Sequence, residues 1–258
     1  MKTINWKVFF ILWVAAILAT LAVLPYALEL QSGLLDQLPI PLLALIALQT
    51  LQTGILFGIL ILIGLILMRR VGLSTPILDS LTNRESYADK FSAILPISIG
   101  LGVIASLIII GLDVLFQPLL LLELGDKANT LTQTSQPAAW KGFLASFYGG
   151  IGEEILLRLF VMTLFAWLGS FVSKTSEGKP TSVVVWIANI LAAILFGLGH
   201  LPALSALAPL TTFVVIRTVI LNAVGGIIFG WLYQTHGLES AMIAHFSADI
   251  VLHVLLAL

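Results

Sequence analysis

The sequence predicts an all-α membrane protein, a polytopic bundle of seven to eight transmembrane helices. Of its 258 residues, 59% are hydrophobic and only 10% are charged, and its mean hydropathy is +1.10. Soluble domains carry roughly 25% charged residues. Because about 20 apolar residues cross the hydrocarbon core, a chain of this length can supply seven or eight spans. An ordinary soluble globule is excluded.

Charge and cysteine content narrow the function further. The 12 Lys and Arg residues nearly cancel the 13 Asp and Glu residues, for a net charge of -1, so no basic surface indicates a nucleic-acid partner. The chain has no cysteine, which excludes disulfides, thiolate nucleophiles and Cys-based metal sites. Any metal would need His and carboxylate ligands.

The hydrophobic stretches are long and separated by polar loops. The first exceeds the roughly 7–15 apolar residues of a secretory signal and no cleavage site follows it, so we expect a retained helix. The sixth is too long for a simple span and is expected to be tilted, kinked or split. The predicted spans are 8–28, 40–68, 93–121, 142–172, 183–200, 206–234 and 240–258. Residues 1–141 carry three spans without a motif, and residues 142–258 carry the motifs, within one membrane domain.

The basic residues predict how the spans are oriented across the membrane. In a seven-span topology they fall in loops on one side, which the positive-inside rule makes cytoplasmic. We therefore expect a cytoplasmic N-terminus in a lipid bilayer, that of a prokaryotic cell. The residues are Lys2, Lys7, Arg69, Arg70, Arg84, Lys90, Lys174 and Lys179.

Ionisable residues inside the later spans indicate a functional site. Each costs at least about 2.5–3.5 kcal/mol at bilayer depth, so such groups persist mainly where they face a cavity and have partners. Positions four apart share a helix face, so Glu154 can pair with Arg158 while Glu153 points elsewhere and is the better general base. His245 and Asp249 share a face of the last helix, and His200 ends the fifth span.

Other polar and small residues have simpler interpretations. Asn222 is either interhelical glue or a polar lining of the site, and Gly225, Gly226 and Gly230 favour close helix packing. Asp113 and Arg217 are expected to pair across helices. We place His236 and His253 outside the site.

Three of these patterns occur together in a known family. Glu153-Glu154-x-x-x-Arg158, Phe196-x-x-x-His200 and His245-x-x-x-Asp249, on separate spans and in this order, resemble the signature of the CPBP family, the CAAX-protease and bacteriocin-processing intramembrane proteases. The segment from Asn222 to Tyr233 is similar as well. The resemblance covers roughly residues 142–255.

The resemblance implies hydrolysis of a peptide bond in a membrane-associated peptide or lipidated protein, such as a prenylated CAAX protein. Glu153 would activate water with help from His200, and His245 with Asp249 would stabilise the oxyanion. Glu154 and Arg158 would support the base, together with Asn222 and Phe196.

Asp249 stands where the better-known CAAX proteases carry Asn. An ionised Asp only accepts hydrogen bonds, so it is either protonated or has another role. Metal-free, glutamate-dependent hydrolysis is the favoured mechanism. A zinc site of Glu153, His200, His245 and Asp249, with water in an open position, is the alternative.

The depths of the three main site residues along the predicted spans conflict with a shared site. Glu153 falls at mid-depth, His200 near the outer end and His245 near the cytoplasmic end, so the three could not meet. A span boundary must then be wrong, or the sixth segment must break, for which Arg217 and Gly225-Gly226 mark the expected place.

The sequence disfavours three other classes of intramembrane protease. His-Glu-x-x-His, Gly-x-Ser-Gly and Gly-x-Gly-Asp, the motifs of three other intramembrane protease classes, are absent from the sequence. A non-catalytic scaffold or bacteriocin immunity protein on the same fold and a proton-coupled transporter are the alternatives from other classes.

Overall fold

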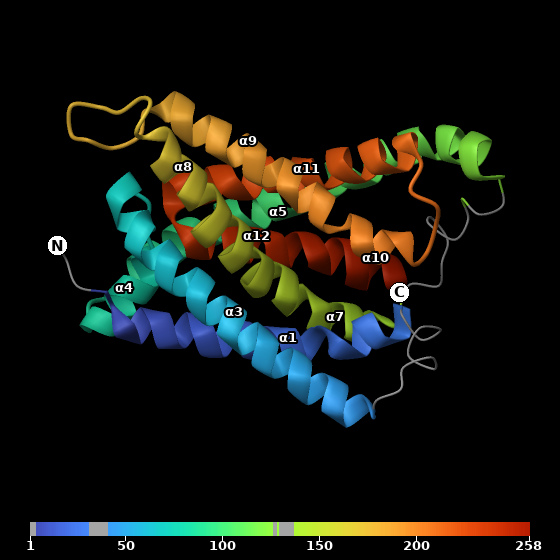
Figure 1. The fold of residues 1–258 in the computed structure, drawn as a ribbon, viewed down its shortest axis with the longest axis horizontal. Coiled ribbons are helices and arrows are strands. Elements are labelled where there is room, and N and C mark those ends of the chain that lie inside the picture. Colours follow the sequence, from blue (N-terminus) through green and yellow to red (C-terminus); the bar gives the residue numbers. More distant parts are fainter. Residues whose placement is uncertain (1–3, 31–40, 126–127, 129–136) are drawn as a thin grey trace.

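The computed structural model describes residues 4–30, 41–125, 128 and 137–258. Figure 1 shows long helices packed side by side into an elongated bundle. Their bounds are α1 Trp6–Leu30, α3 Leu42–Val71, α4 Pro76–Asn83, α5 Ala88–Leu124, α7 Ala139–Phe147, α8 Thr163–Gly169, α9 Ser182–Gly199, α10 Leu201–Ser205, α11 Thr212–His236 and α12 Leu238–Asp249. The predicted all-α polytopic fold is confirmed.

Six helices in the described part of the chain are long and apolar enough to cross a membrane: α1, α3, α5, α9 with α10, α11, and α12 with its extension to Ala257. A further helical run extends from α7 to α8 through two π-helical segments, η2 Tyr148–Glu153 and η3 Ile155–Met162. Apolar side chains such as Leu43, Leu115 and Leu122 are exposed, as expected where a helix faces lipid.

The sixth predicted span differs from its prediction. The chain leaves α9 through the short helix α10, turns over residues 206–211, and then forms one uninterrupted helix, α11. The break therefore precedes Thr212, and the expectation of a break at Arg217 or at Gly225-Gly226 is wrong. Both glycines lie in regular helix, and a Cβ on Gly226 would come within 2.7 Å of the Ala193 Cβ, so Gly226 lets α11 approach α9 closely.

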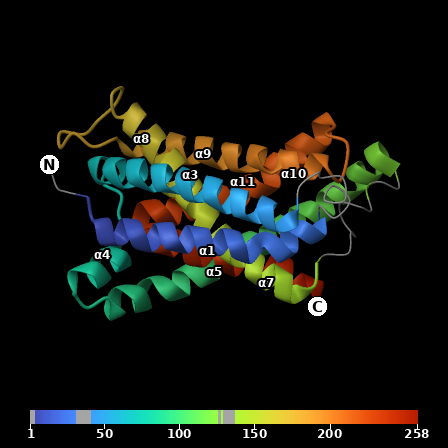
Figure 2. The ribbon, with the colours of Figure 1, turned by 60° about the horizontal axis from the view of Figure 1, so that its bottom comes forward.

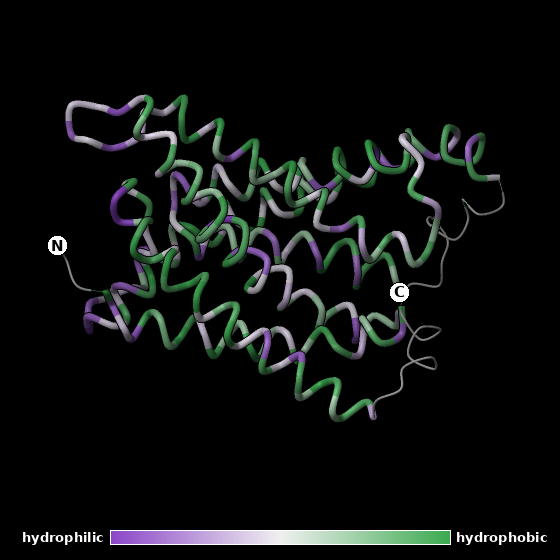
Figure 3. The backbone as a smooth tube through the Cα atoms, viewed as in Figure 1, coloured by the Kyte–Doolittle hydropathy of each residue, from purple (hydrophilic) through white to green (hydrophobic). Residues whose placement is uncertain are grey.

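The polar segments of the chain gather at one end of the bundle. Figure 3 shows hydrophilic backbone around the N-terminal end of α1, the C-terminal end of α3, α4 and the loop between α8 and α9. Lys7 donates to the Thr82 carbonyl and Lys90 to the Ser80 hydroxyl at this end. At the opposite end Lys141 pairs with Glu29.

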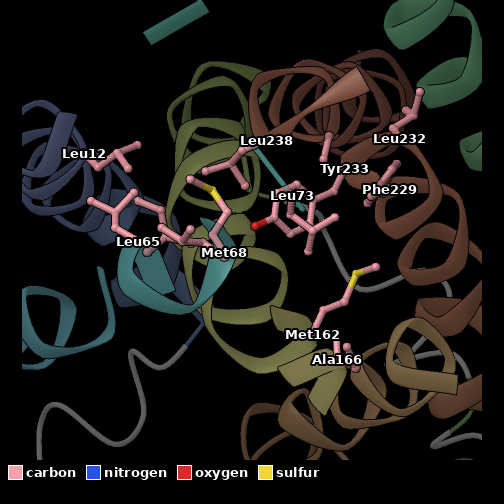
Figure 4. Packing of buried hydrophobic residues seen from close by; sticks show 14 of the residues in the cluster. Leu12, Leu65, Met68, Leu73, Met162, Ala166, Phe229, Leu232, Tyr233 and Leu238 are labelled. Atoms are coloured by element: carbon pink, nitrogen blue, oxygen red, sulfur yellow. The ribbon is translucent and has the colours of Figure 1, made fainter. Parts of the chain in front are cut away.

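One hydrophobic cluster packs the bundle together. It takes residues from helices of both halves of the chain, including Leu12 of α1, Met68 of α3, Met162 of η3 and Phe229 of α11 (Figure 4). Figure 2 shows α1 running along the bundle, where it packs against α3, α7 and η2. Helix α12 contacts α5, α11 and η2, and this central position places its polar residues inside the protein.

Candidate active site

The centre of the site is a pair of consecutive glutamates on a π-helical turn. The π-helix is rare and often marks functional sites, because the extra residue per turn changes the direction of the side chains. Glu153 ends η2 and Glu154 follows it. The Glu154 side chain is fully buried, whereas the Glu153 side chain is 21% exposed. Only Glu153 of the two is therefore open to water.

Glu154 lies between a cation and an imidazole. Its Oε1 is 3.1 Å from Arg158 Nη1 and 2.7 Å from His245 Nδ1. The predicted pairing of Glu154 with Arg158 is confirmed. Arg158 also donates to the Gly226 carbonyl at 2.8 Å, and its guanidinium lies over the rings of Phe196 and Phe229. Removing one partner of such a buried network typically costs 3–5 kcal/mol.

Glu154 fixes the orientation of His245. A carboxylate only accepts hydrogen bonds, so His245 Nδ1 donates and Nε2 points to the other acids. Nε2 lies 3.6 Å from Glu153 Oε2 and 3.6 Å from Asp249 Oδ1. The ring stacks on Phe229 and meets the edge of Phe196. His245 is thus held by the hydrogen bond from Nδ1 to Glu154 and by the rings of Phe229 and Phe196.

His200 lies apart from this ion-pair cluster. Within the described residues no ion pair joins it to Glu153, whose nearest imidazole contact is His245. His200 Nδ1 donates to the Phe196 carbonyl at 2.9 Å, which leaves a lone pair on Nε2 of the neutral ring. The Phe196 ring contacts both imidazoles edge-on.

A cavity of about 170 Å³ unites the predicted residues. Glu153, Phe196, His200, Asn222, His245 and Asp249 all line it. A water molecule needs only about 10–15 Å³ of such space. Asn222 is therefore a lining residue, whose Nδ2 donates to the Thr218 carbonyl. The depth conflict does not hold, because Glu153, His200 and His245 line the same cavity, and α12 begins at Leu238, before the start of the predicted span.

Other residues that line the cavity were not predicted from the sequence. Tyr26 of α1, Ile109 of α5, Tyr148 of η2 and His253 line it too, and the Tyr26 hydroxyl lies 3.4 Å from His253 Nδ1. The placement of His253 outside the site is wrong. Its spacing supplied a signal, because His253 follows Asp249 by four residues and shares its helix face.

Gly149 allows Asp249 and His245 of α12 to lie close to η2. A Cβ at this position would lie 2.0 Å from Asp249 Oδ2 and 3.1 Å from His245 Nε2. Only a residue without a side chain fits between η2 and α12 here. The run of glycines before the glutamate pair was the sequence signal for this contact.

The predicted zinc ligands do not fit a metal site as they stand. No group of three or more His, Asp and Glu side chains among the described residues has the arrangement of a metal-binding cluster. The donor set of Glu153, His200, His245 and Asp249 is therefore not carried further as a zinc site.

Fold and site together define an integral membrane protein whose helical bundle encloses a cavity lined by ionisable side chains. Residues 135–251 match the family model of the type II CAAX prenyl endopeptidases, Rce1-like. The match falls on the part of the chain that carries the motifs, in agreement with the resemblance that they indicated. It holds Glu153, Glu154, His200, His245 and Asp249, whereas α1 and α5 lie outside the match. No curated protein and no solved structure shows significant similarity to the chain.

Proposed function

We propose that this protein is an intramembrane endopeptidase of the CAAX-protease type, which hydrolyses a peptide bond of a membrane-associated substrate with water activated by Glu153. The observation that carries the proposal is the different exposure of the two glutamates. Glu154 is fully buried and occupied by Arg158 and His245, while Glu153 reaches the cavity with 21% of its side chain exposed. A general base must contact the water that it deprotonates.

The attacking water would lie between Glu153 and His200. The Glu153 carboxylate accepts a proton as the water oxygen bonds to the scissile carbonyl carbon. His200 Nε2, left with a lone pair by the bond from Nδ1 to Phe196, accepts the second hydrogen bond and orients the water. Orientation of this kind lowers the entropic part of the barrier.

His245 would stabilise the oxyanion. As an imidazolium it donates from Nδ1 to Glu154 and keeps a proton on Nε2, which faces the cavity. Asp249, 3.6 Å from Nε2, favours this charged form. In this proposal Asp249 acts on His245 and need not touch the oxyanion.

Collapse of the tetrahedral intermediate completes the reaction. The C–N bond breaks, the leaving amine takes the proton held by Glu153, and the carbonyl re-forms as a carboxylic acid that ionises. Glu153 returns to its carboxylate form, so one water is consumed for each peptide bond.

Cleavage of a reporter peptide in liposomes tests the proposal. The peptide would carry a C-terminal CAAX sequence with a prenylated cysteine, and products would be identified by mass spectrometry. Glu153→Gln keeps the size of the side chain but removes the base, so we expect a rate at least about 100-fold lower. Glu85→Gln, at an exposed position between α4 and α5, is the matched control and should cleave at the wild-type rate.

Other outcomes point to other functions. Full activity of Glu153→Gln would remove the base assignment. A wild-type protein that releases no product, but takes up a solute in a pH-dependent manner, would indicate transport. An unprenylated peptide cleaved as fast as the prenylated one would show that the lipid is not recognised.

A further inference from the structure

A cavity of about 1020 Å³ opens at the polar end of the bundle. Its wall is formed by the start of α1, the end of α3 with the turn that follows, α4, and the loop between α8 and α9. Figure 3 shows these segments as the hydrophilic end of the molecule. Among the described residues, none that lines the candidate active-site cavity also lines this one. The two cavities are therefore separate.

The lining of this cavity carries an excess of positive charge. Lys7, Arg69 and Lys179 line it, each from a different segment of the chain. In the described part of the chain, the acidic residue that lines it is Asp79. Its carboxylate lies 3.7 Å from Arg69 Nη2 and accepts a hydrogen bond from Asn5 at 3.3 Å. One carboxylate faces three cations, so the cavity attracts anions.

The two lysines are the cations best placed to bind an anion. Lys7 Nζ donates to the Thr82 carbonyl at 3.3 Å, which holds the ammonium group without neutralising its charge. The Lys179 stem lies against Gly72, where a Cβ would come within 3.2 Å of Lys179 Cδ. Lys179 also pairs with Glu177, but these side chains are 51% and 71% exposed. An exposed pair of this kind is weak, so a stronger anion can replace Glu177.

A row of apolar side chains leads away from the cavity along the outside of α1. Trp6 lines the cavity and is 53% exposed. Phe10, Val14 and Leu18 follow at intervals of four residues and are 54%, 48% and 59% exposed. Side chains four apart are neighbours on a helix surface, so the row is continuous. Its twelve-residue span is about 18 Å of helix rise, slightly more than half of the roughly 30 Å hydrocarbon core.

A basic cavity joined to an apolar row one leaflet long matches a molecule with an anionic head and acyl chains. We propose that this cavity binds the phosphate-bearing headgroup of an anionic phospholipid and that an acyl chain lies along the row on α1. Lys7 and Lys179 pair with the phosphate, and Trp6 lies at the boundary between head and chain, where tryptophan is enriched in membrane proteins. A zwitterionic lipid would bring its own cation towards the lysines, and a soluble phosphate would leave the row unused.

Lipid binding to the protein in detergent, followed by native mass spectrometry, tests the proposal without any cleavage reaction. We expect the Kd for phosphatidylglycerol to be at least about tenfold lower than that for phosphatidylcholine with the same acyl chains. In the double variant Lys7→Gln with Lys179→Gln, this preference should be lost. Arg70→Gln with Lys174→Gln is the matched control. It removes the same charge from the same end of the bundle, outside the cavity lining, and should keep the wild-type Kd.

A labelling experiment places the bound lipid. The chain has no native cysteine, and Asn83 lines the cavity at an exposed position. Phosphatidylglycerol should slow the reaction of Asn83→Cys with a polar maleimide, whereas phosphatidylcholine and glycerol 1-phosphate at the same concentration should not. Adding Lys7→Gln and Lys179→Gln should abolish this protection.

Three results would overturn the proposal. They are equal Kd values of the wild-type protein for the two lipids, an equal loss of binding in both double variants, and protection of Asn83→Cys by glycerol 1-phosphate as strong as by the lipid. The second would indicate a general effect of surface charge, and the third a site for soluble phosphate compounds. Should the Lys7 and Lys179 variant fail to fold, the wild-type Kd ratio and the protection of Asn83→Cys decide.

Discussion

His245 Nδ1 lies 2.7 Å from Glu154 Oε1, inside a bundle where neither side chain is more than 6% exposed. This contact joins η2–η3 to α12 and makes Glu154 a positioning residue, which sets the direction of the imidazole that faces Glu153 and Asp249. Glu154, which was expected to support the site through Arg158, therefore also contacts His245.

Replacing Glu154 should affect both stability and catalysis. Glu154→Gln removes the counter-charge of buried Arg158, so we expect a loss of about 3–5 kcal/mol in the free energy of unfolding. We also expect kcat to fall while KM stays similar, because the cavity wall is retained. Unfolding in detergent micelles and steady-state kinetics check both parts, and an unchanged kcat would contradict the positioning role.

Gly149 provides a test of the close approach between η2 and α12. Because a Cβ there would overlap Asp249 Oδ2, Gly149→Ala should displace Asp249 and reduce cleavage at least tenfold. Gly111→Ala is the matched control, since a Cβ at Gly111 meets nothing within 4 Å, and alanine favours helix over glycine by about 1 kcal/mol. Equal activity of the two variants would show that the contact with Asp249 is unimportant.

Replacing Asp249 by Asn should reduce activity less than replacing it by Ala. Asp249→Asn retains an oxygen at the place of the carboxylate oxygen, 3.6 Å from His245 Nε2, whose negative partial charge still attracts the imidazolium, whereas Asp249→Ala removes it. We expect the Asn variant to keep activity within about tenfold of wild type and the Ala variant to lose at least about 100-fold, the upper part of what one positioned group contributes. Parallel kcat/KM values for the two variants decide this, and an Ala variant as active as the Asn variant would rule out the proposed role.

Glu239 is expected to matter for stability alone. Its Oε1 accepts from the backbone N–H groups of Ile77 and Leu78, at the start of α4. Glu239→Ala should cost about 1–3 kcal/mol, because it leaves these donors unpaired, and should speed proteolysis of the segment 72–87. Glu239 is not among the residues that line the candidate active-site cavity. The kcat/KM of the protein that remains folded should therefore not change. A lowered kcat/KM in that fraction would contradict this separation.

The predicted orientation can be tested by labelling, because the chain has no native cysteine. Ser176, between α8 and α9, and Ser205, the last residue of α10, are both exposed. Figure 1 shows the α8–α9 loop and α10 towards opposite ends of the bundle. By the positive-inside rule, Ser176→Cys should react with a membrane-impermeant maleimide only in inverted vesicles. Ser205→Cys should react in intact cells. The reverse pattern would mean that the basic end faces outward.

Much of the fold followed from the sequence because hydropathy dictates where helices cross a bilayer. The charged residues of the motifs indicated their own site, since an ionisable residue inside a span, such as Glu153 or His245, persists mainly where it faces a cavity and has partners. The positions of the site residues along their spans could not be predicted from the sequence. They depend on the π-helical turns around Glu153 and on the start of α12, which apolar periodicity does not reveal. Tyr26 was missed because an aromatic residue in an apolar span gives no signal of the cavity that it faces.

The contribution of Tyr26 and Ile109 to the cavity wall has a consequence for dissecting this protein. An excised piece that begins near residue 135 would retain every motif and the whole Rce1-like match. It would nevertheless lack two sides of the chamber, and acyl chains would take the place of the missing helices. The carboxylates would then lie against hydrocarbon, so an intact cavity requires the N-terminal half of the chain as well as the half that bears the motifs.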